Sequence, residues 1–258
     1  MVLLLDVGNT NIKIGVLSSG KLSETWRIAT DHAKTADEFG MLLGSLLTSI
    51  GCKFSAVDGV IISSVAPSLN YTVEHMCTHY IKKTPLYVGS KIKLPITIGY
   101  DNPDELGADR IVTASAAYVQ YGGPVIVADF GSATTFGAVS ASGVFLGGAI
   151  APGIKASAES LTASTAKLPR IELLKPKSPI GTNTVNNMQA GIIYGFAGVV
   201  DKILKEMKKS KELKGAKVIA TGGLSELISD VLDVPFDAID RPLSLNGLKI
   251  LYELNNKK

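Results

Sequence analysis

Histidine, cysteine and tryptophan are scarce in this chain of 258 residues, which holds three, two and one of them. The two cysteines, Cys52 and Cys77, form neither a CxxC pair nor a disulfide framework. We expect each to be a small buried or half-buried residue in a reducing compartment. All three histidines lie before residue 80, which leaves no basis for a Ser-His-Asp triad.

Long apolar runs are also absent. The apolar start Val2–Leu5 is interrupted by Asp6, too early for the core of a secretory signal. The run Ala190–Val200 is shorter than the roughly 20 residues that cross a bilayer. These features predict a soluble, cytoplasmic protein with no membrane partner.

Charge of one sign is not concentrated either, because the net charge is only +3. The main basic cluster lies between Lys202 and Lys217, where Ile203, Leu204 and Met207 recur at helical spacing. That pattern is typical of a solvated helix face. We therefore predict no nucleic-acid partner.

Several familiar site motifs are missing. The chain has no GxxxxGK[ST] loop and no GxGxxG after a strand. Asp129-Phe130-Gly131 spells the DFG of protein kinases, but no HRD loop precedes it, so that match is accidental. His75 and His79 are four residues apart, yet no third zinc ligand is evident, which favours a solvated helix face.

What the chain does contain is a repeat. Val2–Gly20 and Val125–Gly143 both read as strand, turn, strand, turn, with a third strand to follow. They align at one constant offset without a gap, and the matched positions are Asp6 with Asp129, Gly8 with Gly131, Val16 with Val139, Ser19 with Ser142 and Gly20 with Gly143. Two such units predict a duplicated domain.

Helical patterns follow each copy, so the fold class is α/β. We expect two duplicated domains, residues 1–118 and 119–258, each a mixed sheet flanked by helices, facing each other across a cleft. The last helix can join either domain. The predicted elements are strands at 12–17, 22–28, 57–63 and 216–220, and helices at 35–50, 67–82, 104–120, 153–161, 184–208 and 245–254.

The two Asp-x-Gly turns predict a nucleotide site. A carboxylate at the end of a buried strand is costly unless a cation or hydrogen bonds pair with it. Glycine two residues later lets backbone N–H groups approach a phosphate. Mg²⁺ suits such a place, with Asp6 and Asp129 as candidate ligands and Lys13 to neutralise phosphate charge. Either aspartate alone would more simply be a turn former.

An ordered set of motifs over nearly the whole chain resembles the type III pantothenate kinase family, within the acetate/sugar kinase, Hsp70 and actin superfamily with its RNase H-like, actin-like ATPase domains. The motifs are Asp6-Val7-Gly8-Asn9-Thr10 with Lys13 and Gly15, Gly107-Ala108-Asp109-Arg110, Asp129-Phe130-Gly131-Ser132-Ala133-Thr134-Thr135, Gly147 to Gly153, Thr184 with Gln189 and Gly191, Thr221-Gly222-Gly223, and Leu245-Asn246-Gly247-Leu248.

The resemblance implies ATP-dependent phosphorylation of pantothenate, the first step of coenzyme A synthesis. It implies Asp109 as general base and Asp129 as the ligand of K⁺ or NH₄⁺ beside Mg²⁺. The residues implied to contact ATP are Asp6, Val7, Gly8, Asn9, Thr10, Asn11, Ile12, Lys13 and Ser132, and those implied to contact pantothenate are Tyr100, Gly107, Ala108, Asp109, Arg110 and Thr184. It also implies a homodimer with a pocket at its interface.

Simpler interpretations of these residues stay open. Asp109 and Arg110 could be a surface helix pair with side chains pointing apart, Tyr100 could cover a hydrophobic edge, and Thr184 could be a helix N-cap. Ser132 stands where the family usually has threonine, and Gly137 where some members have an acid, so details of cation binding are open. Rival functions are another small-molecule kinase of the superfamily, a non-catalytic actin-fold regulator, and a polyphosphate hydrolase.

Overall fold

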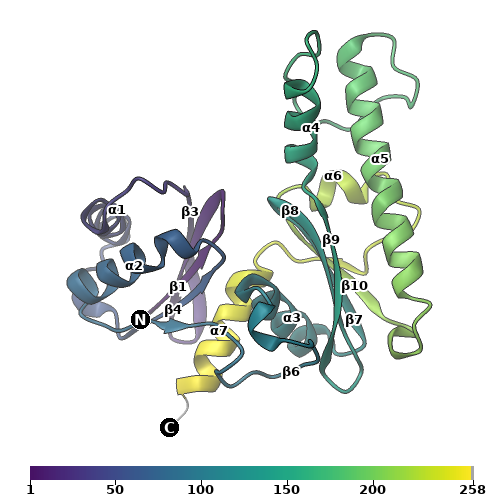
Figure 1. Cartoon of the computed structure of the whole chain (residues 1–258). Coiled ribbons are helices and arrows are strands. Elements are labelled where there is room, and N and C mark those ends of the chain that lie inside the picture. Colours follow the sequence, from purple (N-terminus) through teal and green to yellow (C-terminus); the bar gives the residue numbers. More distant parts are fainter. Residues whose placement is uncertain (257–258) are drawn as a thin grey trace. The chain divides into compact units, whose positions relative to one another are not determined.

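The computed structural model describes residues 1–256, which divide into two compact units (Figure 1). Unit 1 comprises Met1–Pro95, Asp101–Ala116 and the segment from Leu243 onward, and unit 2 comprises Ile96–Tyr100 and Ala117–Pro242. The last helix therefore belongs to the first unit. None of the helices within the described residues combines the length and the apolarity that a membrane span requires.

Unit 1 is built on a five-stranded mixed sheet in the order β3-β2-β1-β4-β5. The first three strands form antiparallel hairpins, and β4 and β5 run parallel to β1. Ser19 and Gly20 turn the chain between β2 and β3 with φ angles of 48° and 74°, the left-handed region that hairpin turns favour. The strands are β1 (Val2–Val7), β2 (Asn11–Ser18), β3 (Lys21–Ala29), β4 (Gly59–Ser64) and β5 (Leu86–Tyr87).

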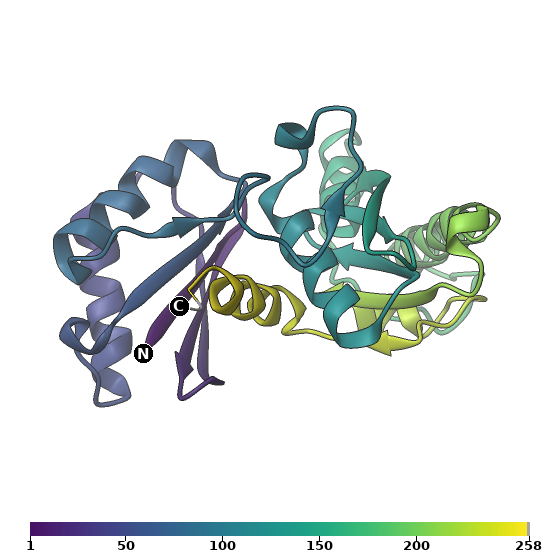
Figure 2. The ribbon, with the colours of Figure 1, turned by 90° about the horizontal axis from the view of Figure 1, so that it is seen from below.

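Helices cover both faces of this sheet. α1 (Ala36–Ser49) begins with a capping box made by Thr35 and Glu38. α2 (Pro67–Met76) starts with proline, which suits the first helical position, and continues into a π turn, η2 (Cys77–Ile81). Both helices pack on one face, and α7 (Leu243–Asn256) lies against the other (Figures 1 and 2).

The cysteines behave as the sequence predicts. Cys77 is fully buried in the apolar core between this sheet and helices α1 and α2, while Cys52 is partly buried at its margin. Burial raises the pKa of the Cys77 thiol to about 12, so it stays a protonated, apolar core residue.

The helix predicted at 104–120 begins later than expected. A short 3₁₀ turn, η3 (Pro103–Glu105), comes first, and α3 (Ala108–Tyr121) starts after Gly107. A Cβ atom at residue 107 would lie 2.7 Å from Oδ1 of Asp109, so the glycine makes room for a carboxylate that folds back over the helix start. Asp109 therefore lies in the first turn of α3 rather than in mid-helix.

Unit 2 repeats this topology. Its six-stranded sheet has the order β11-β10-β7-β8-β9-β6, with antiparallel β7-β8-β9 hairpins and with β10 and β11 parallel to β7. Two mixed sheets of matching strand order confirm the predicted duplicated α/β architecture. The strands are β6 (Thr97–Ile98), β7 (Val125–Phe130), β8 (Ala133–Val139), β9 (Val144–Pro152), β10 (Lys217–Gly222) and β11 (Ala238–Ile239).

Three helices complete unit 2: α4 (Ile154–Ala163), α5 (Thr184–Met207) and α6 (Ser225–Ser229). Their apolar faces bury β7, β8 and β10. In Figure 1, α4 and the first half of α5 run side by side beyond the end of the sheet. This part of unit 2 consequently has few strand neighbours to cover its apolar side chains.

Candidate active site

The first Asp-x-Gly turn carries its own counter-charge. The antiparallel register of β1 and β2 sets Asp6 opposite Lys13, and Lys13 Nζ lies 3.3 Å from Asp6 Oδ2. The same Nζ donates a 3.0 Å hydrogen bond to Oγ of Ser244, at the start of α7. Asp6 is 11% and Lys13 26% exposed, so the ammonium group is fixed in place while keeping limited access to solvent.

The turn between these two residues is held from both sides. The N–H of Gly8 donates to the carbonyl of Asn11 at 3.1 Å, and a Cβ at residue 8 would lie only 3.0 Å from that oxygen. The hydroxyl of Thr30 donates to the carbonyl of Gly8 at 2.6 Å. Asn9 and Thr10 form the exposed tip. A short, fixed turn of this kind suits the binding of phosphate oxygens.

Asp109 lies in the same unit, and its electrostatic environment includes Asp6. Burial, followed by the negative charge of Asp6, raises the pKa of Asp109 above its ordinary value of 3.8. The backbone N–H of Arg110 acts in the opposite direction by donating to Oδ1 of Asp109 at 2.8 Å. Asp109 is thus a desolvated carboxylate with an increased affinity for protons.

Arg110 is buried, with 8% of its surface exposed, and Asp109 is half-buried. The interpretation of these two residues as a solvated surface pair is therefore wrong. Ala108, the other residue of the motif, is buried at 9% exposure. Burial of a guanidinium group is costly unless anions or hydrogen-bond acceptors pair with it.

Sequence reasoning missed two serines of this region. Ser244 holds Lys13, and it directly precedes the Leu245-Asn246-Gly247-Leu248 motif. Ser63 is paired in register with Asp6 across β1 and β4, is fully buried, and its hydroxyl has no hydrogen-bond partner in the structure. The available signal was a polar residue near the end of a buried strand, because Ser63 is the last residue but one of β4 and Asp6 is the last but one of β1.

The second Asp-x-Gly turn, in unit 2, has different neighbours. Asp129 is half-buried on β7, in register with Thr135 of β8 and Thr221 of β10. The hydroxyl of Thr221 is buried and has no hydrogen-bond partner in the structure. Both residues in register with Asp129 are therefore threonines, whereas Asp6 has Lys13 in register on β2.

Two glycines let the backbone close around the second loop. A Cβ at residue 153 would lie 2.1 Å from the carbonyl oxygen of Ser132, and one at residue 222 would lie 2.5 Å from that of Phe130. Gly222 also has a φ of +94°, which other residues rarely adopt. Ser132 is held at the exposed tip of this loop, three residues from Asp129.

Tyr100 and Thr184 lie elsewhere in unit 2. The ring of Tyr100 packs 5.7 Å from the buried ring of Phe145 on β9, which agrees with the interpretation that it covers a hydrophobic edge. Thr184 is the first residue of α5 and is exposed. The N-cap of that helix is Asn183, whose side chain accepts from the N–H of Asn186, so the N-cap interpretation of Thr184 is wrong.

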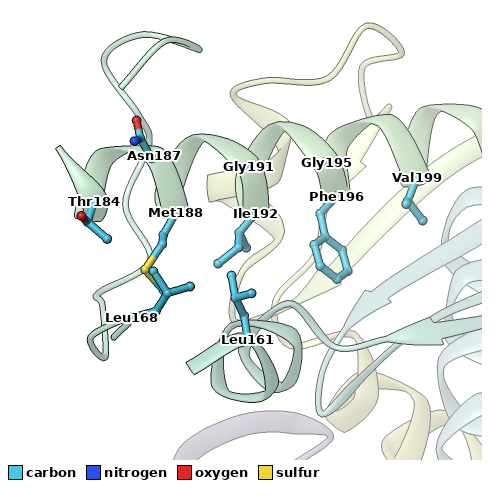
Figure 3. Close-up of a pocket in the computed structure, with 10 residues that line it drawn as sticks. All are labelled: Leu161, Leu168, Thr184, Asn187, Met188, Gly191, Ile192, Gly195, Phe196 and Val199. Atoms are coloured by element: carbon cyan, nitrogen blue, oxygen red, sulfur yellow. The ribbon is translucent and has the colours of Figure 1, made fainter. Parts of the chain in front are cut away.

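Thr184 borders an apolar pocket of about 650 Å³ along α5. Figure 3 shows Met188 and Ile192 pointing from α5 toward Leu168 and Leu161, with Phe196 on the same face of the helix. In Figure 1 the first half of α5 extends beyond the sheet, and Thr184 is the first residue of that helix. Thr184 is thus separated within unit 2 from the loop of Asp129 and Ser132.

The structure therefore brings the predicted residues together in groups. Asp6, Lys13, Asp109 and Arg110 belong to one region of unit 1. Asp129 and Ser132 share a loop of unit 2, while Tyr100 lies at a sheet edge and Thr184 at the pocket on α5. Duplicated mixed sheets, each with an acidic residue before a glycine turn, define the class of actin-like ATPase-fold proteins.

Solved structures confirm this class. The chain matches an activator of 2-hydroxyisocaproyl-CoA dehydratase from Clostridium difficile with bound ADPNP at a TM-score of 0.57, 12% identity and coverage of 99% and 94% of the two chains. It also matches the inorganic polyphosphate/ATP-glucomannokinase from Arthrobacter sp. strain KM at a TM-score of 0.50, 14% identity and coverage of 97% and 98% of the two chains. At such identities the likeness establishes the fold alone.

The family follows from sequence. The family model for type III pantothenate kinase matches residues 2–206. A type III pantothenate kinase from Geobacillus kaustophilus (strain HTA426) is 49% identical over 258 residues, with 100% of this chain and 99% of the relative covered. The chain belongs to the type III pantothenate kinase family and is a phosphotransferase.

Proposed function

We propose that this enzyme transfers the γ-phosphoryl group of ATP to the terminal hydroxyl of pantothenate and so makes 4'-phosphopantothenate, the first step of coenzyme A synthesis. The observation that carries the proposal is family membership over the whole chain at 49% identity. In the reaction the hydroxyl oxygen bonds to the γ-phosphorus, the bond to the β–γ bridging oxygen breaks, and ADP leaves.

Asp109 is the general base that takes the hydroxyl proton. Two features support this role: the carboxylate sits in the first turn of α3, and burial together with Asp6 raises its pKa. A base accepts a proton more readily as its pKa approaches the working pH, provided that it stays ionised there. In phosphoryl transfer the proton leaves late, so a moderate increase suffices.

Arg110 recognises the carboxylate of pantothenate. Its guanidinium offers a planar fork of donors that matches a carboxylate, and its burial strengthens such a charge-assisted pair. Because Arg110 follows Asp109 directly on α3, the acid end and the reacting end of the substrate are both positioned by one helix start.

The first loop, from Asp6 to Lys13, binds the phosphates of ATP, and Ser132 donates to them from the second loop. Lys13, which is fixed by Asp6 and Ser244, neutralises the charge of the transferred group. The fit of Mg²⁺ is supported by Asp6, a carboxylate whose side chain keeps 11% exposure and whose negative charge reaches Asp109. Mg²⁺ bound to ATP supplies charge neutralisation between phosphate oxygens.

Asp129 is the ligand of a monovalent cation, K⁺ or NH₄⁺. The donor set supports this assignment, since Thr135 and Thr221 stand in register with Asp129 and the buried hydroxyl of Thr221 has no hydrogen-bond partner in the structure. Carboxylate and hydroxyl oxygens are suitable ligands for a hard cation.

The enzyme works as a homodimer in which α5 lies at the interface. Val185, Tyr194 and Val199 of α5 are 37–40% exposed, and a side chain at Gly191 or Gly195 would meet nothing within 4 Å. Thr184 is remote from the phosphate loop of its own unit, so it contacts pantothenate in the pocket at that interface, together with Tyr100. A second copy is the occupant that this exposed apolar face fits.

Pantothenate-dependent release of ADP tests the proposal. Purified enzyme with ATP and Mg²⁺ is expected to release ADP only when pantothenate is added, and not with acetate or hexoses. Stimulation by a sugar alone would support the rival superfamily kinase. ATP hydrolysis without any acceptor would support a hydrolase, and nucleotide binding without turnover would support a regulator.

A further inference from the structure

Two of the three histidines lie on one exposed face near the end of α2. His75 belongs to the last turn of α2, and His79 lies in the π turn η2. Their rings are stacked, with centroids 5.8 Å apart and ring planes inclined by 18°. Both side chains are exposed, so neither ring is fixed by burial in a core.

The backbone aligns these two rings. His75 and His79 are four residues apart, a spacing that places two side chains on one face of a helix, and the π turn with its i→i+5 hydrogen bonds begins between them. Thr78 reinforces the local geometry, because its hydroxyl donates to the carbonyl of His75 at 3.1 Å. The turn ends at Lys82, which has a φ of 61°. π turns of this kind often mark binding sites.

Aromatic neighbours support both rings. Tyr71 packs against His75 with a centroid distance of 5.9 Å, and Tyr80 meets His79 edge to face at 5.0 Å. The hydroxyl of Tyr80 donates to Asp37 of α1 at 2.6 Å. Gly40 of α1 leaves room for the Tyr80 ring, since a Cβ atom at residue 40 would lie 2.5 Å from Cδ2 of that ring. The stacked pair is therefore restrained before any ligand arrives.

We propose that His75 and His79 together bind one transition-metal dication of the Ni²⁺, Cu²⁺ or Zn²⁺ type. Zinc–imidazole nitrogen bonds are about 2.0–2.1 Å long, which brings the centroids of two rings on one tetrahedral ion to roughly 5 Å. Small ring rotations close the remaining difference from 5.8 Å. Imidazole suits these ions and not Mg²⁺, so this site is distinct from the one at the phosphates.

Water completes the coordination shell. Within residues 1–256 no group of three or more His, Cys, Asp and Glu side chains is arranged around one point, so the protein supplies two ligands. The remaining histidine, His32, has Nδ1 in a 2.9 Å hydrogen bond with Ser68 and is not stacked with the pair. It provides a matched control of the same residue type.

The test is isothermal titration calorimetry. NiCl₂ is titrated into the purified enzyme, which carries no histidine tag, in a non-chelating buffer. The wild type and His32→Gln are expected to bind one equivalent with the same affinity. His75→Gln and His79→Gln are each expected to bind at least tenfold more weakly. Tyr71→Leu, which removes one supporting ring, is expected to weaken binding about threefold.

Each variant is checked for folding by circular dichroism and for kinase turnover, because these exposed residues lie outside the catalytic machinery. Unchanged Ni²⁺ affinity in His75→Gln or His79→Gln would overturn the proposal, as would a wild type that binds no better than the two variants. An equal loss in His32→Gln would also contradict it, since that result would point to a different set of ligands.

Discussion

The two Asp-x-Gly turns are copies of one structure with different chemistry. In unit 1, Asp6 is paired with Lys13 on one side and with Ser63 on the other. In unit 2, Asp129 stands in register with two threonines. The duplication thus kept the strand order of the sheet and the position of the acid, but it changed the residue opposite each acid.

The turns also differ in length. Three residues separate β1 from β2, whereas two separate β7 from β8. The gapless sequence alignment sets Lys13 against Phe136, which is fully buried, but the observed pairing sets Thr135 opposite Asp129. Because the turn in unit 2 is one residue shorter, the residue opposite the acid shifts by one position. A threonine therefore stands opposite the acid in unit 2, where a lysine stands opposite it in unit 1. The comparison explains why a lysine lies opposite the acid in one turn and a threonine lies opposite it in the other.

The largest effect is expected from Asp109→Asn. Loss of the base should lower kcat about 10³-fold, within the 10²–10⁴ range of general acid–base catalysis, while ATP binding persists. A steady-state assay measures kcat, and a fluorescent nucleotide measures binding. Wild-type turnover in this variant would remove Asp109 from the role.

Lys13→Met tests the counter-charge of the first turn. We expect kcat to fall about 10²-fold, because a fixed cation that faces developing phosphate charge is lost. The corresponding change in unit 2, Thr135→Val, should lower kcat only a few-fold. Equal effects of the two variants would show that the difference between the turns has no functional meaning.

Asp129→Asn sharpens the comparison in the opposite direction. The variant is expected to lose about tenfold in kcat/KM and to lose the advantage of K⁺ over Na⁺, because the proposed ligand no longer carries a full negative charge. Asp6→Asn is the control, and it should keep its preference for K⁺ at a lower rate. Retained K⁺ stimulation in Asp129→Asn would place the monovalent cation elsewhere.

Ser63→Ala tests whether the serine beside Asp6 positions that carboxylate. We expect a loss of about threefold to tenfold in kcat with little change in the KM for pantothenate, and recovery in Ser63→Thr. Ser115 is a matched control, because it is also fully buried with a hydroxyl that lacks a partner in the structure, but it lies on α3 away from the strand ends. Equal kinetics in Ser63→Ala and Ser115→Ala would assign both serines to packing.

The smallest expected effect is the change in thermal stability that follows from the raised pKa of Asp109. Because its folded-state pKa lies above 3.8, its stabilising contribution is present below that pH and is lost as pH rises through the raised value. At pH 7, Asp109→Asn should therefore raise the melting temperature, by about 2–4 °C for each kcal/mol of relief. In the wild type, kcat/KM should fall as pH decreases through the same raised pKa. A lower melting temperature for the variant would contradict the sign.

Much of the fold could be predicted from the sequence, because apolar strands that end in Asp-x-Gly are visible as a repeat. The residues that lie opposite Asp6 and Asp129 could not be predicted, since the one-residue difference in turn length leaves no gap in the alignment of 2–20 with 125–143. The start of α3 was missed because the role of Gly107 is steric and depends on the Asp109 side chain. Ser63 and Ser244 were missed because single serines at strand and helix ends are common.

Two pairs of adjacent residues, Asp109–Arg110 and Asn183–Thr184, also could not be interpreted from the sequence alone. The sequence could not establish the burial of Arg110, because adjacent Asp and Arg on a helix usually point apart. Asn183 and Thr184 are both good caps, and only the hydrogen bond to Asn186 distinguishes them. The roles assigned to these residues rest on the family likeness, to which the structure adds contacts and burial.

The most direct test of the account is pantothenate-dependent ADP release measured in K⁺ and in Na⁺ at equal ionic strength. We expect turnover that requires pantothenate and that is at least several-fold faster in K⁺, because Asp129 is the proposed ligand of that ion. Turnover with pantothenate that is equally fast in both salts would contradict the proposed difference between the two turns. No turnover with pantothenate, in folded enzyme, would contradict the proposed reaction itself.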